Sequence, residues 1–529
     1  MIPFGGPPAQ RGTVYLVGGG PGDPGLLGLR AARLLSTATL VAYDRLSPPQ
    51  ALALCPDGCE QVYVGKLPDR HALPQPELNQ LLVARALGGD AVVRLKGGDP
   101  FVLGRGSEEA LACAAAGVPF EVVPAVTSAT AAPAYAGIPV THRSLAAGFA
   151  VVTGHEDPSK GASQVDYDAL ARFPGTLVLL MGVGRIGEIA AALVAAGKDA
   201  ATPVAVVRWG STPRQQTLVA TLGDVGERVA EAGFGPPAVT VVGEVAALRE
   251  DLAWFDRRPL HGVSVLVPRT RHQASELSDR LRALGAEPVE APTIAIEPTR
   301  DPEGLRLALA KLADGAYDWV AFTSANGVDA VWEQVQVLGL DARLFARTRL
   351  AVVGPGTGEA LAARGLRADL VPERYTTRGL ADALVAAGDR VHAGSPPTPR
   401  GRRVLLPRAD IATPTLTQAL AEAGWDTVEV EAYRTVRARA LPGPVAERLA
   451  AGDVDVLAFA SSSTVRNFVD LLGGPVDPRM RVASIGPVTS ETCRELGLRV
   501  DAEADPHDLD GLVEAVIAAV VGVRSGQVT

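Results

Sequence analysis

The stretch Val92–Glu109 reads VVRLKGGDPFVLGRGSEE and combines a strand, a break and a helix start. Its first residues are apolar and β-branched, as in a buried strand. Gly97 and Gly98, followed by Asp99 and a proline, end that strand, and GRGSEE (104–109) has the pattern of a first helical turn. A simple turn needs fewer special residues. The stretch therefore predicts an α/β sheet with a binding site at the carboxyl edge of its strands.

Strand-like and helix-like segments alternate along the whole chain, which is typical of α/β units with mainly parallel sheets. The segment AWFDRRPLHG (253–262) interrupts this alternation with charge, proline and glycine, and we take it as the main domain boundary. The strand-like runs are TVYLVGGG (13–20), LVAYD (40–44), AVVRLKGG (91–98), FEVVPAV (120–126), TLVLLMG (176–182), PVAVVRWG (203–210), VSVLVPRT (263–270), WVAFTSANG (319–327), LAVVGPG (350–356), RVLLPRA (403–409), VLAFASSS (456–463) and RVASIGP (481–487).

The bulk composition is that of an ordinary globular protein that is too long for one core. The chain has 529 residues, of which 47% are hydrophobic and 21% are charged. Its net charge of −9 argues against a nucleic-acid-binding protein. Only five lysines stand against 45 arginines, so each lysine attracts attention.

The cysteines and the apolar runs predict a cytoplasmic protein without a metal site or a membrane segment. The four cysteines fit no common zinc pattern, because Cys55 and Cys59 lack a second pair. Reduced thiols are usual in the cytosol. No basic and apolar leader is visible in the first residues, and no apolar run reaches the roughly 18 residues of a membrane span.

The second half of the chain contains an internal repeat. VLVPR at Val265 returns as VLLPR 139 residues later, and FTSANGV at Phe322 returns as FASSSTV 137 residues later. VGPGT at Val353 returns as IGPVT 132 residues later. Three signatures in the same order at similar offsets predict two similar α/β lobes.

Two extended segments and one irregular segment lie within this repeat. APTIAIEP (291–298) and VEVEAYRTV (428–436) alternate polar and apolar residues, which predicts a two-stranded connector between lobes and a cleft beside it. AAGDRVHAGSPPTPRGRR (386–403) is rich in proline, glycine and arginine and is predicted to be a surface insertion.

The loop in VYLVGGGPGDPGLLGLRA (14–31) resembles a dinucleotide fingerprint but departs from it. Asp23 stands at the position of the third glycine, and Pro21 removes an amide that could hold phosphate. The loop therefore predicts close backbone approach to a ligand other than a pyrophosphate. A tight strand–helix turn is the alternative.

The first half contains an ordered set of motifs: GGGPGDPGLLGLRA, AYDRLSP, VGK, VVRLKGGDPFVLGRGSEE, VPAVTSATAAPAYAGIPVTHR, VTGH, LVLLMGV, PVAVVRWGSTPRQ and PPAVTVVGEV. Together, over about residues 12–255, they resemble the uroporphyrinogen-III C-methyltransferases of the tetrapyrrole methylase superfamily. The resemblance implies two lobes (12–124 and 125–255), a linker (256–261), S-adenosyl-L-methionine held between the lobes, and a homodimer formed through this half. It also implies methylation of uroporphyrinogen III at C2 and C7 to precorrin-2, with S-adenosyl-L-homocysteine released.

The resemblance carries over a set of binding residues. Arg105 and Glu108 are expected on the macrocycle side, because the substrate has eight carboxylates that an arginine can hold. His142 and Arg143 are further candidates for these carboxylates. Ala125 departs from the family, which has glycine there. The residues that match cofactor contacts are Pro21, Gly97, Gly98, Asp99, Val102, Thr127, Ser128, Met181 and Gly210.

Asp44 in YDRL and Lys66 in VGK match the family's proposed proton-transfer positions. A neutral thioether leaves during methyl transfer, so the protons that must move are those on the macrocycle. A turn cap for Asp44 and a solvated surface lysine for Lys66 are the alternatives.

The second half resembles uroporphyrinogen-III synthase over about residues 262–520, through VLVPRT, FTSANGV, VVGPGT, TTRGLADAL, AYRTV, FASSSTV and IGPVT. The resemblance implies one lobe from 262–296 and 436–520 and a second from 297–435, which includes the connector. It implies cyclisation of hydroxymethylbilane with inversion of ring D and no cofactor. Tyr433 matches a suspected proton donor, and the candidate substrate ligands, each of which could instead be a helix N-cap, are Thr323, Ser324, Asn326, Ser461, Ser462 and Thr489.

The sequence thus predicts a two-enzyme fusion that acts on small tetrapyrroles and serves sirohaem or cobalamin synthesis. One alternative is a methylase for another precorrin. The other is a second half that senses a tetrapyrrole and regulates the pathway. No appended DNA-binding helix pair is evident, which disfavours the regulator.

Overall fold

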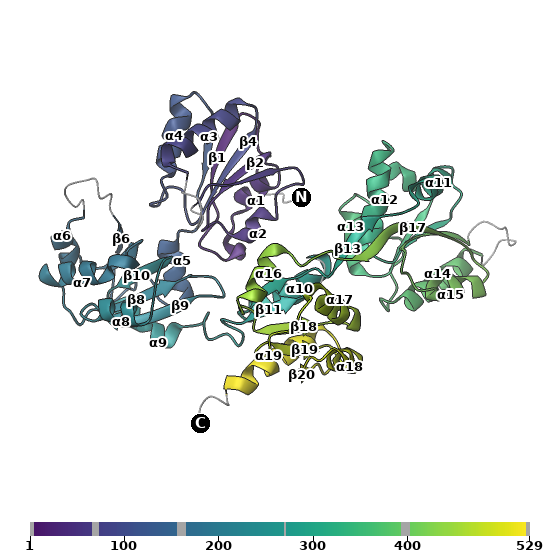
Figure 1. Ribbon diagram of the computed structural model, residues 1–529. Coiled ribbons are helices and arrows are strands. Elements are labelled where there is room, and N and C mark those ends of the chain that lie inside the picture. Colours follow the sequence, from purple (N-terminus) through teal and green to yellow (C-terminus); the bar gives the residue numbers. More distant parts are fainter. Residues whose placement is uncertain (1–4, 66–72, 156–164, 269–270, 393–401, 525–529) are drawn as a thin grey trace. The chain divides into compact units, whose positions relative to one another are not determined.

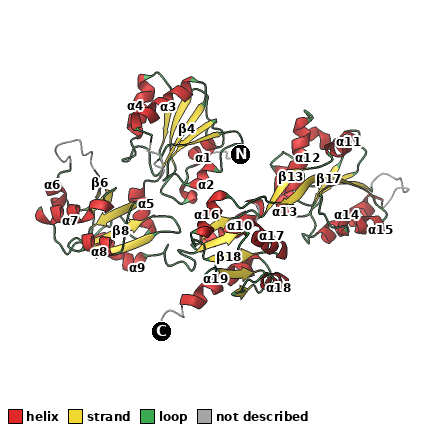
Figure 2. Cartoon of the chain, viewed as in Figure 1, coloured by secondary structure: helices red, strands yellow, loops and turns green. Residues whose placement is uncertain are grey.

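The computed structural model describes residues 5–65, 73–155, 165–268, 271–392 and 402–524. The chain divides into two compact units and contains four five-stranded sheets. The first unit extends to Val265 and also includes Ser278–Pro288 and the end of α19 from Val520, and the second comprises Leu266–Leu277 and Val289–Ala519. Each sheet is flanked by helices, which confirms the α/β class (Figure 2).

The first sheet is parallel throughout and has the order β3-β2-β4-β1-β5. Helices α1 and α2 cover one face, and α3 and α4 cover the other (Figure 1). The bounds are β1 Thr13–Gly18, β2 Leu40–Tyr43, β3 Glu60–Tyr63, β4 Ala91–Lys96, β5 Phe120–Val123, α1 Leu29–Leu35, α2 Pro49–Leu52, α3 Gln75–Leu87 and α4 Gly106–Ala115.

Alternate residues of each strand pack on opposite faces of this sheet. In β1, Val14 and Leu16 pack toward α3 and α4, whereas Tyr15 and Val17 pack toward α1 and α2. The strands read as continuous apolar runs because both faces are buried. Since all five strands run in one direction, the loops that follow β1, β2 and β4 meet at one edge.

The second sheet has the order β6-β7-β10-β8-β9. It is mixed, whereas the sequence predicted mainly parallel strands. Only β6 and β7 pair in parallel, because β8 and β9 are joined by a connection too short for a crossover and β10 returns between β7 and β8. The bounds are β6 Phe149–Thr153, β7 Thr176–Leu180, β8 Pro203–Arg208, β9 Gln216–Thr221, β10 Ala238–Val242, α5 Ser128–Tyr135, α6 Tyr167–Arg172, α7 Ile186–Ala195, α8 Val225–Glu231 and α9 Arg249–Leu252.

The segment 253–262 is packed and does not form an open spacer. Phe255 and Leu260 are buried, and the Tyr135 and Phe255 rings lie 4.8 Å apart. The indole N–H of Trp254 donates to the Ala134 carbonyl at 3.0 Å. The domain boundary in this segment stays a prediction.

The two copies of the internal repeat lie in the third and fourth sheets. Their orders are β12-β11-β18-β19-β20 and β13-β17-β16-β14-β15. The repeated signatures mark equivalent strands: VLV (265–267) lies on β11, FASSS begins at the last residue of β18, and IGP directly follows β19. Their counterparts stand on β16, at the end of β14 and after β15, and these strands have the same spatial order. The strands are β11 Ser264–Val267, β12 Glu287–Glu290, β13 Ile294–Pro298, β14 Trp319–Phe322, β15 Arg349–Val352, β16 Arg403–Ala409, β17 Asp426–Arg437, β18 Val456–Phe459, β19 Arg481–Ser484 and β20 Ala502–Glu503.

The predicted connector is present as β13 and β17, which pair in an antiparallel manner. Of the predicted surface insertion, residues 386–392 belong to α14, and 393–401 lie outside the described residues. The helices are α10 Arg271–Ala283, α11 Pro302–Ala313, α12 Ala325–Val337, α13 Pro355–Ala362, α14 Thr377–His392, α15 Thr415–Glu422, α16 Gly443–Ala450, α17 Ser462–Leu472, α18 Pro487–Glu495 and α19 Leu509–Arg524.

Helices α11, α12 and α13 cover one face of the fourth sheet, and α14 and α15 cover the other. A search of the described helices finds none with the length and apolar character needed to cross a membrane.

Candidate functional site

A cavity of about 1380 Å³ lies in the first unit, at the carboxyl edge of the first sheet. The loops after β1, β2 and β4 form one wall, and α5 with the loops after β7 and β8 forms another. Pockets for single small ligands usually measure about 300–1,000 Å³. The volume is therefore sufficient for a cofactor together with part of a larger substrate.

The glycine loops present bare backbone to this cavity. Gly20 and Gly98 both have positive φ, of 78° and 68°, and bond to each other, with the Gly98 amide donating to the Gly20 carbonyl at 2.7 Å. A Cβ on Gly97 would lie 2.6 Å from the Cβ of Leu46, and one on Gly210 would lie 2.4 Å from the Cβ of Ala132. Side chains at these positions would push into the cavity wall.

Nine of the residues predicted from the sequence line the cavity. They come from both lobes, so the fold brings together motifs that are far apart in the chain. They are Pro21, Asp44, Gly97, Gly98, Val102, Arg105, Ser128, Met181 and Gly210. Lys66 lies outside the described residues.

Asp99 is not among the residues that line the cavity, and its expected contact with the cofactor stays a prediction. One of its carboxylate oxygens accepts a hydrogen bond from the Phe101 amide at 2.8 Å, and the other accepts one from the Ala125 amide at 3.0 Å. The side chain therefore ties the loop after β4 to the segment that leads into α5.

Thr127, Glu108 and His142 also lie off the cavity wall. Thr127 caps α5 by accepting from the Ala129 amide at 3.3 Å. Glu108 forms a two-bond ion pair with Arg105, and this guanidinium lowers the pKa of Glu108. The exposed His142 stands in a tight turn in which its amide donates to the Ala146 carbonyl.

A chain of hydrogen bonds joins the two walls of the cavity. The Tyr135 hydroxyl donates to the Asp23 carboxylate at 2.6 Å, and the Asp23 amide donates to the Ser211 hydroxyl at 3.2 Å. The Ser211 amide donates to Gln215, whose side chain donates back to the Tyr135 carbonyl. Desolvation by burial, followed by the bond to Asp23, raises the pKa of Tyr135.

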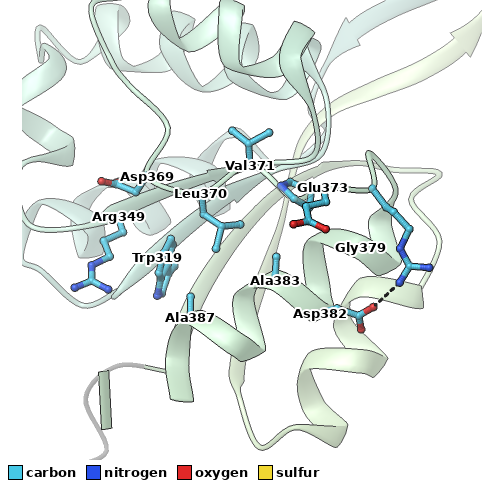
Figure 3. A pocket seen from close by; sticks show the side chains of 12 residues that line it. Trp319, Arg349, Asp369, Leu370, Val371, Glu373, Gly379, Asp382, Ala383 and Ala387 are labelled. Atoms are coloured by element: carbon cyan, nitrogen blue, oxygen red, sulfur yellow. Dashed lines mark ion pairs between the residues drawn. The ribbon is translucent and has the colours of Figure 1, made fainter. Parts of the chain in front are cut away.

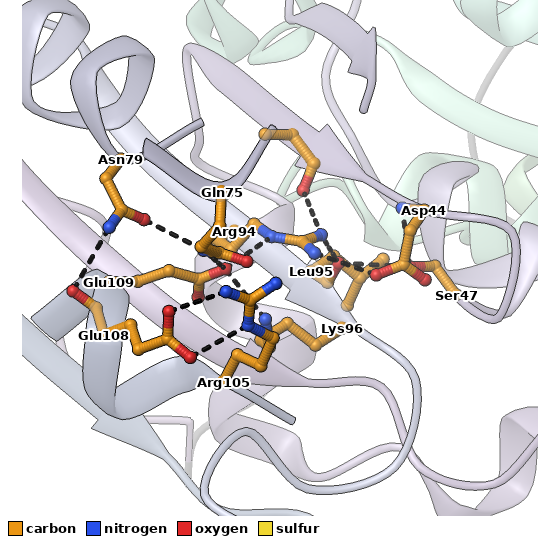
Figure 4. A network of polar contacts seen from close by, with 11 residues as sticks. Asp44, Ser47, Gln75, Asn79, Arg94, Leu95, Lys96, Arg105, Glu108 and Glu109 are labelled. Atoms are coloured by element: carbon orange, nitrogen blue, oxygen red, sulfur yellow. Dashed lines mark hydrogen bonds and ion pairs between the residues drawn. The ribbon is translucent and has the colours of Figure 1, made fainter. Parts of the chain in front are cut away.

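The first wall contains a buried charged network that the sequence did not predict (Figure 4). Arg94 and Lys96 point from β4 toward α4, where Glu109 is fully buried. One oxygen of Glu109 accepts from Lys96 Nζ at 2.8 Å and from Arg94 Nε at 3.3 Å. Arg94 Nη2 donates to Asp44 at 2.9 Å. The network therefore ends on a predicted catalytic residue.

The environment of Lys96 is unusual for a lysine, because its side chain is only 6% exposed. Desolvation lowers the pKa of Lys96, and the nearby Arg94 charge lowers it further, whereas Glu109 raises it. Arg94, Lys96 and Asp44 line the cavity. The sequence signal was two basic residues on one face of a buried strand, which require a buried carboxylate.

In the second unit, Tyr433 and Ser324 come together. The Tyr433 hydroxyl on β17 lies 2.9 Å from the Ser324 hydroxyl, which also caps α12 by accepting from the Gly327 amide. Thr323 directly follows β14 and Asn326 lies in the first turn of α12, and both are half-buried.

The candidates of the other lobe have local roles. Ser461 caps α17 by accepting from the Thr464 amide at 3.3 Å. The Ser462 hydroxyl donates to the Val488 carbonyl at 3.1 Å, and Thr489 is buried in α18. The N-cap alternative therefore holds for Ser461, and for Ser324 it holds together with the bond to Tyr433.

A second hollow, of about 920 Å³, lies at the opposite end of the fourth sheet (Figure 3). Trp319 and Arg349, which are the first residues of β14 and β15, line it together with Glu373 and Asp382. Thr323 and Ser324 follow the last residue of β14, so this hollow is separate from the predicted synthase residues.

Two family models match the chain, one for each half. The model of the tetrapyrrole (corrin/porphyrin) methylases matches residues 13–226, and that of uroporphyrinogen-III synthase HemD matches residues 275–514. The porphyrin biosynthesis protein HemD of Ruminiclostridium josui is 35% identical over 508 residues, which are 96% of this chain and 98% of that protein.

The first half alone has further relatives. The S-adenosyl-L-methionine-dependent uroporphyrinogen III methyltransferase of Methanosarcina barkeri is 48% identical over 241 residues, covering 46% of this chain and 94% of that protein. The crystal structure of uroporphyrin-III C-methyl transferase from Thermus thermophilus, complexed with S-adenyl homocysteine, is 47% identical and covers 45% of this chain and 99% of that one, with a TM-score of 0.39.

Proposed function

Because this chain belongs to the family in which a tetrapyrrole methylase is joined to a uroporphyrinogen-III synthase, we propose that its halves catalyse consecutive steps on one tetrapyrrole. The second half converts hydroxymethylbilane into uroporphyrinogen III, with inversion of ring D. The first half then methylates uroporphyrinogen III at C2 and C7 to precorrin-2.

The observation that carries the methylase proposal is the cavity edge of bare glycine backbone. A side chain on Gly97 would collide with Leu46, and Gly98 has a positive φ that disfavours any side chain, so a ligand there meets main-chain groups. Met181 and Val102 add apolar surface that suits the adenine and thioether parts of S-adenosylmethionine. The residues therefore fit this cofactor, which supplies an electrophilic methyl group when bound.

Asp44 is proposed as the group that accepts a proton during methylation. A ring carbon gains the methyl group and the macrocycle gains positive charge, so one proton must leave the macrocycle. The Asp44 carboxylate lines the cavity and is held by Arg94. Lys66 stays a proposed proton-transfer residue on the strength of its motif.

The acidic substituents of the macrocycle need cationic partners. Arg105 lines the cavity and is 57% exposed, so its guanidinium is accessible although it pairs with Glu108. We propose that this arginine exchanges part of that pairing for a substrate carboxylate. Glu108 is then the residue that orients Arg105. Asp99 and Thr127 stay proposed cofactor residues, which hold the loop after β4 and the start of α5, and His142 is a further proposed carboxylate ligand.

In the synthase half, Tyr433 is proposed as the proton donor to the leaving hydroxyl. The carbon–oxygen bond breaks as water forms with the donated proton, and the substituted ring D carbon attacks the resulting cation to give a spiro centre. The older bond from that carbon to its bridging methylene then breaks and re-forms at the other α-carbon of ring D, which inverts the ring, and loss of one proton from that carbon restores the pyrrole. The hydrogen bond to Ser324 supports this proposal, because it fixes the phenol. Thr323, Asn326, Ser461, Ser462 and Thr489 are proposed carboxylate ligands.

The wider organisation is also a proposal. We propose the lobe limits given above, a homodimer formed through the methylase half, and activity in the cytoplasm on small tetrapyrroles. Size measurement of the isolated first half would test the dimer.

A two-substrate assay on the purified full chain tests the function. Hydroxymethylbilane alone should give uroporphyrinogen III, and addition of S-adenosylmethionine should convert it to a dimethylated product. Gly97→Val should remove the second step and spare the first, because its side chain fills only the methylase cavity wall. Formation of the non-inverted isomer alone would contradict the synthase proposal.

A further inference from the structure

The buried carboxylate of Glu109 has a feature that its packing role does not explain. One oxygen receives both Lys96 and Arg94, whereas the other, Glu109 Oε2, has no hydrogen-bond partner among the described residues although it is buried. Two cations thus share one oxygen of a side chain that has no solvent exposure. Buried charges are costly unless they are well paired. An oxygen left without a partner adds to that cost, so a purely structural salt bridge does not explain the arrangement.

The hydrogen bonds of Arg94 connect Glu109 to Asp44, which lines the cavity. Arg94 is held at four points, because it also donates to the carbonyls of Leu95 at 2.7 Å and Ala42 at 3.4 Å. Its remaining bond goes to Asp44. Figure 4 shows the guanidinium between the two carboxylates, with the ammonium of Lys96 beside Glu109. A shift of Glu109 would therefore move both cations relative to the cavity wall.

We propose that Glu109 is a positioning residue for methylation: its carboxylate fixes Arg94, which orients Asp44, and fixes Lys96, which lines the cavity. This inference rests on the proposed role of Asp44. The charged groups near Lys96 are Arg94 on β4, Glu109 and Glu108 on α4, and Asp44 after β2. Glu108 is paired with Arg105, and Gln75 of α3 donates to Glu109 at 3.3 Å.

The main test is Glu109→Gln, which keeps the shape and one acceptor but removes the charge. The methylation kcat should fall about 10- to 100-fold, the range found when a supporting partner of a functional group is lost. Affinity for S-adenosylmethionine, measured by calorimetry, and synthase turnover should both stay within about threefold of wild type. An unchanged kcat would overturn the proposal.

The pH profile separates positioning from general damage. Glu109 raises the pKa of Lys96, so its loss leaves desolvation and Arg94 to lower that pKa further. The methylation rate of Glu109→Gln should therefore decline at a lower alkaline pH than that of wild type. A profile that is scaled down without any shift would overturn the role of Lys96.

A double-mutant cycle tests the link to Asp44. Asp44→Asn should lower kcat by about 10²–10⁴-fold if Asp44 transfers a proton. Adding Glu109→Gln should then cost little more, because residues that act through one another are not additive. Full multiplication of the two losses would overturn the proposal.

Two results distinguish failure of this inference from failure of the proposed function. If Asp44→Asn retains the wild-type rate, the proposed role of Asp44 is wrong. The role of Glu109 then depends on the shift in the alkaline limb of the pH profile, and absence of that shift overturns the inference. If Asp44→Asn is slow and Glu109→Gln is fast, only the inference falls.

A paired variant and a control guard against misfolding. Lys96→Met with Glu109→Gln removes one cation and one anion together, and it should still bind the cofactor while methylating at least about tenfold more slowly. Wild-type turnover by this pair would overturn the proposal. The matched control is Glu121→Gln on β5 of the same sheet, which breaks a two-bond pair with Arg30 of α1 and should retain the wild-type rate.

Discussion

Replacement of Asp99 by alanine tests how the cofactor loop is held. The change removes two hydrogen bonds to a carboxylate, from the amides of Phe101 and Ala125. Bonds to a charged group contribute about 1.5–3 kcal/mol each. Because the loop is partly exposed, water replaces part of this loss, so we take about 1.5–3 kcal/mol for both bonds together. If the bound state needs the braced loop, affinity for S-adenosylmethionine should fall about 10- to 150-fold.

The assay is calorimetric titration of S-adenosylmethionine, with synthase turnover as a check that the chain is intact. Asp99→Asn is the matched variant, since its amide keeps one acceptor oxygen and should lose an intermediate part of the affinity. Unchanged affinity in Asp99→Ala would refute the bracing role. Equal losses in the two variants would show that the charge itself acts on the ligand.

Three further outcomes are expected from other parts of the chain. Tyr433→Phe should slow formation of uroporphyrinogen III about 10²-fold or more, and Ser324→Ala should slow it less; a Tyr433→Phe rate within about threefold of wild type would exclude the phenol as donor. The Arg85 guanidinium lowers the pKa of Asp90, so this ion pair stabilises the fold at pH values above the unfolded-state pKa and loses that effect as pH falls through the folded-state pKa. Arg85→Gln should therefore lower Tm at pH 7 and hardly at all near about pH 2. Equal losses of Tm at both pH values would contradict the assignment. A cut before Val263 should give two separately active proteins, and aggregation of both fragments where the full chain is soluble would show that the halves share a core.

Most strands could be predicted from the sequence because each apolar run is followed directly by glycine or by small polar residues. The apolar run of β4 stops at Gly97, and that of β14 stops at Thr323, as expected. The pairing directions were harder, because a short connection such as 209–215 looks the same in sequence whether a helix follows or a strand. The second sheet therefore differed from the expectation of mainly parallel strands.

The cavity wall could be predicted where backbone exposure selects the residue, and less well where a charge has two possible uses. Gly97 and Gly98 line the cavity, but Asp99 beside them turns toward the backbone of Ala125. In the pair Glu108 and Glu109, only burial separates the surface ion pair from the buried network. That difference depends on how α4 rotates against β4, which one sequence does not specify.

The paired serine caps at the ends of β14 and β18 have a consequence for how the second half could evolve. Ser324 and Ser461 end equivalent strands of the repeat, and each caps the following helix through its hydroxyl. In one copy the same hydroxyl also meets Tyr433. Each lobe thus carries a serine that caps a helix, and in one lobe this serine can also bond to a second side chain while in the other it only caps the helix. Selection on chemistry in one lobe then need not weaken the fold of its twin.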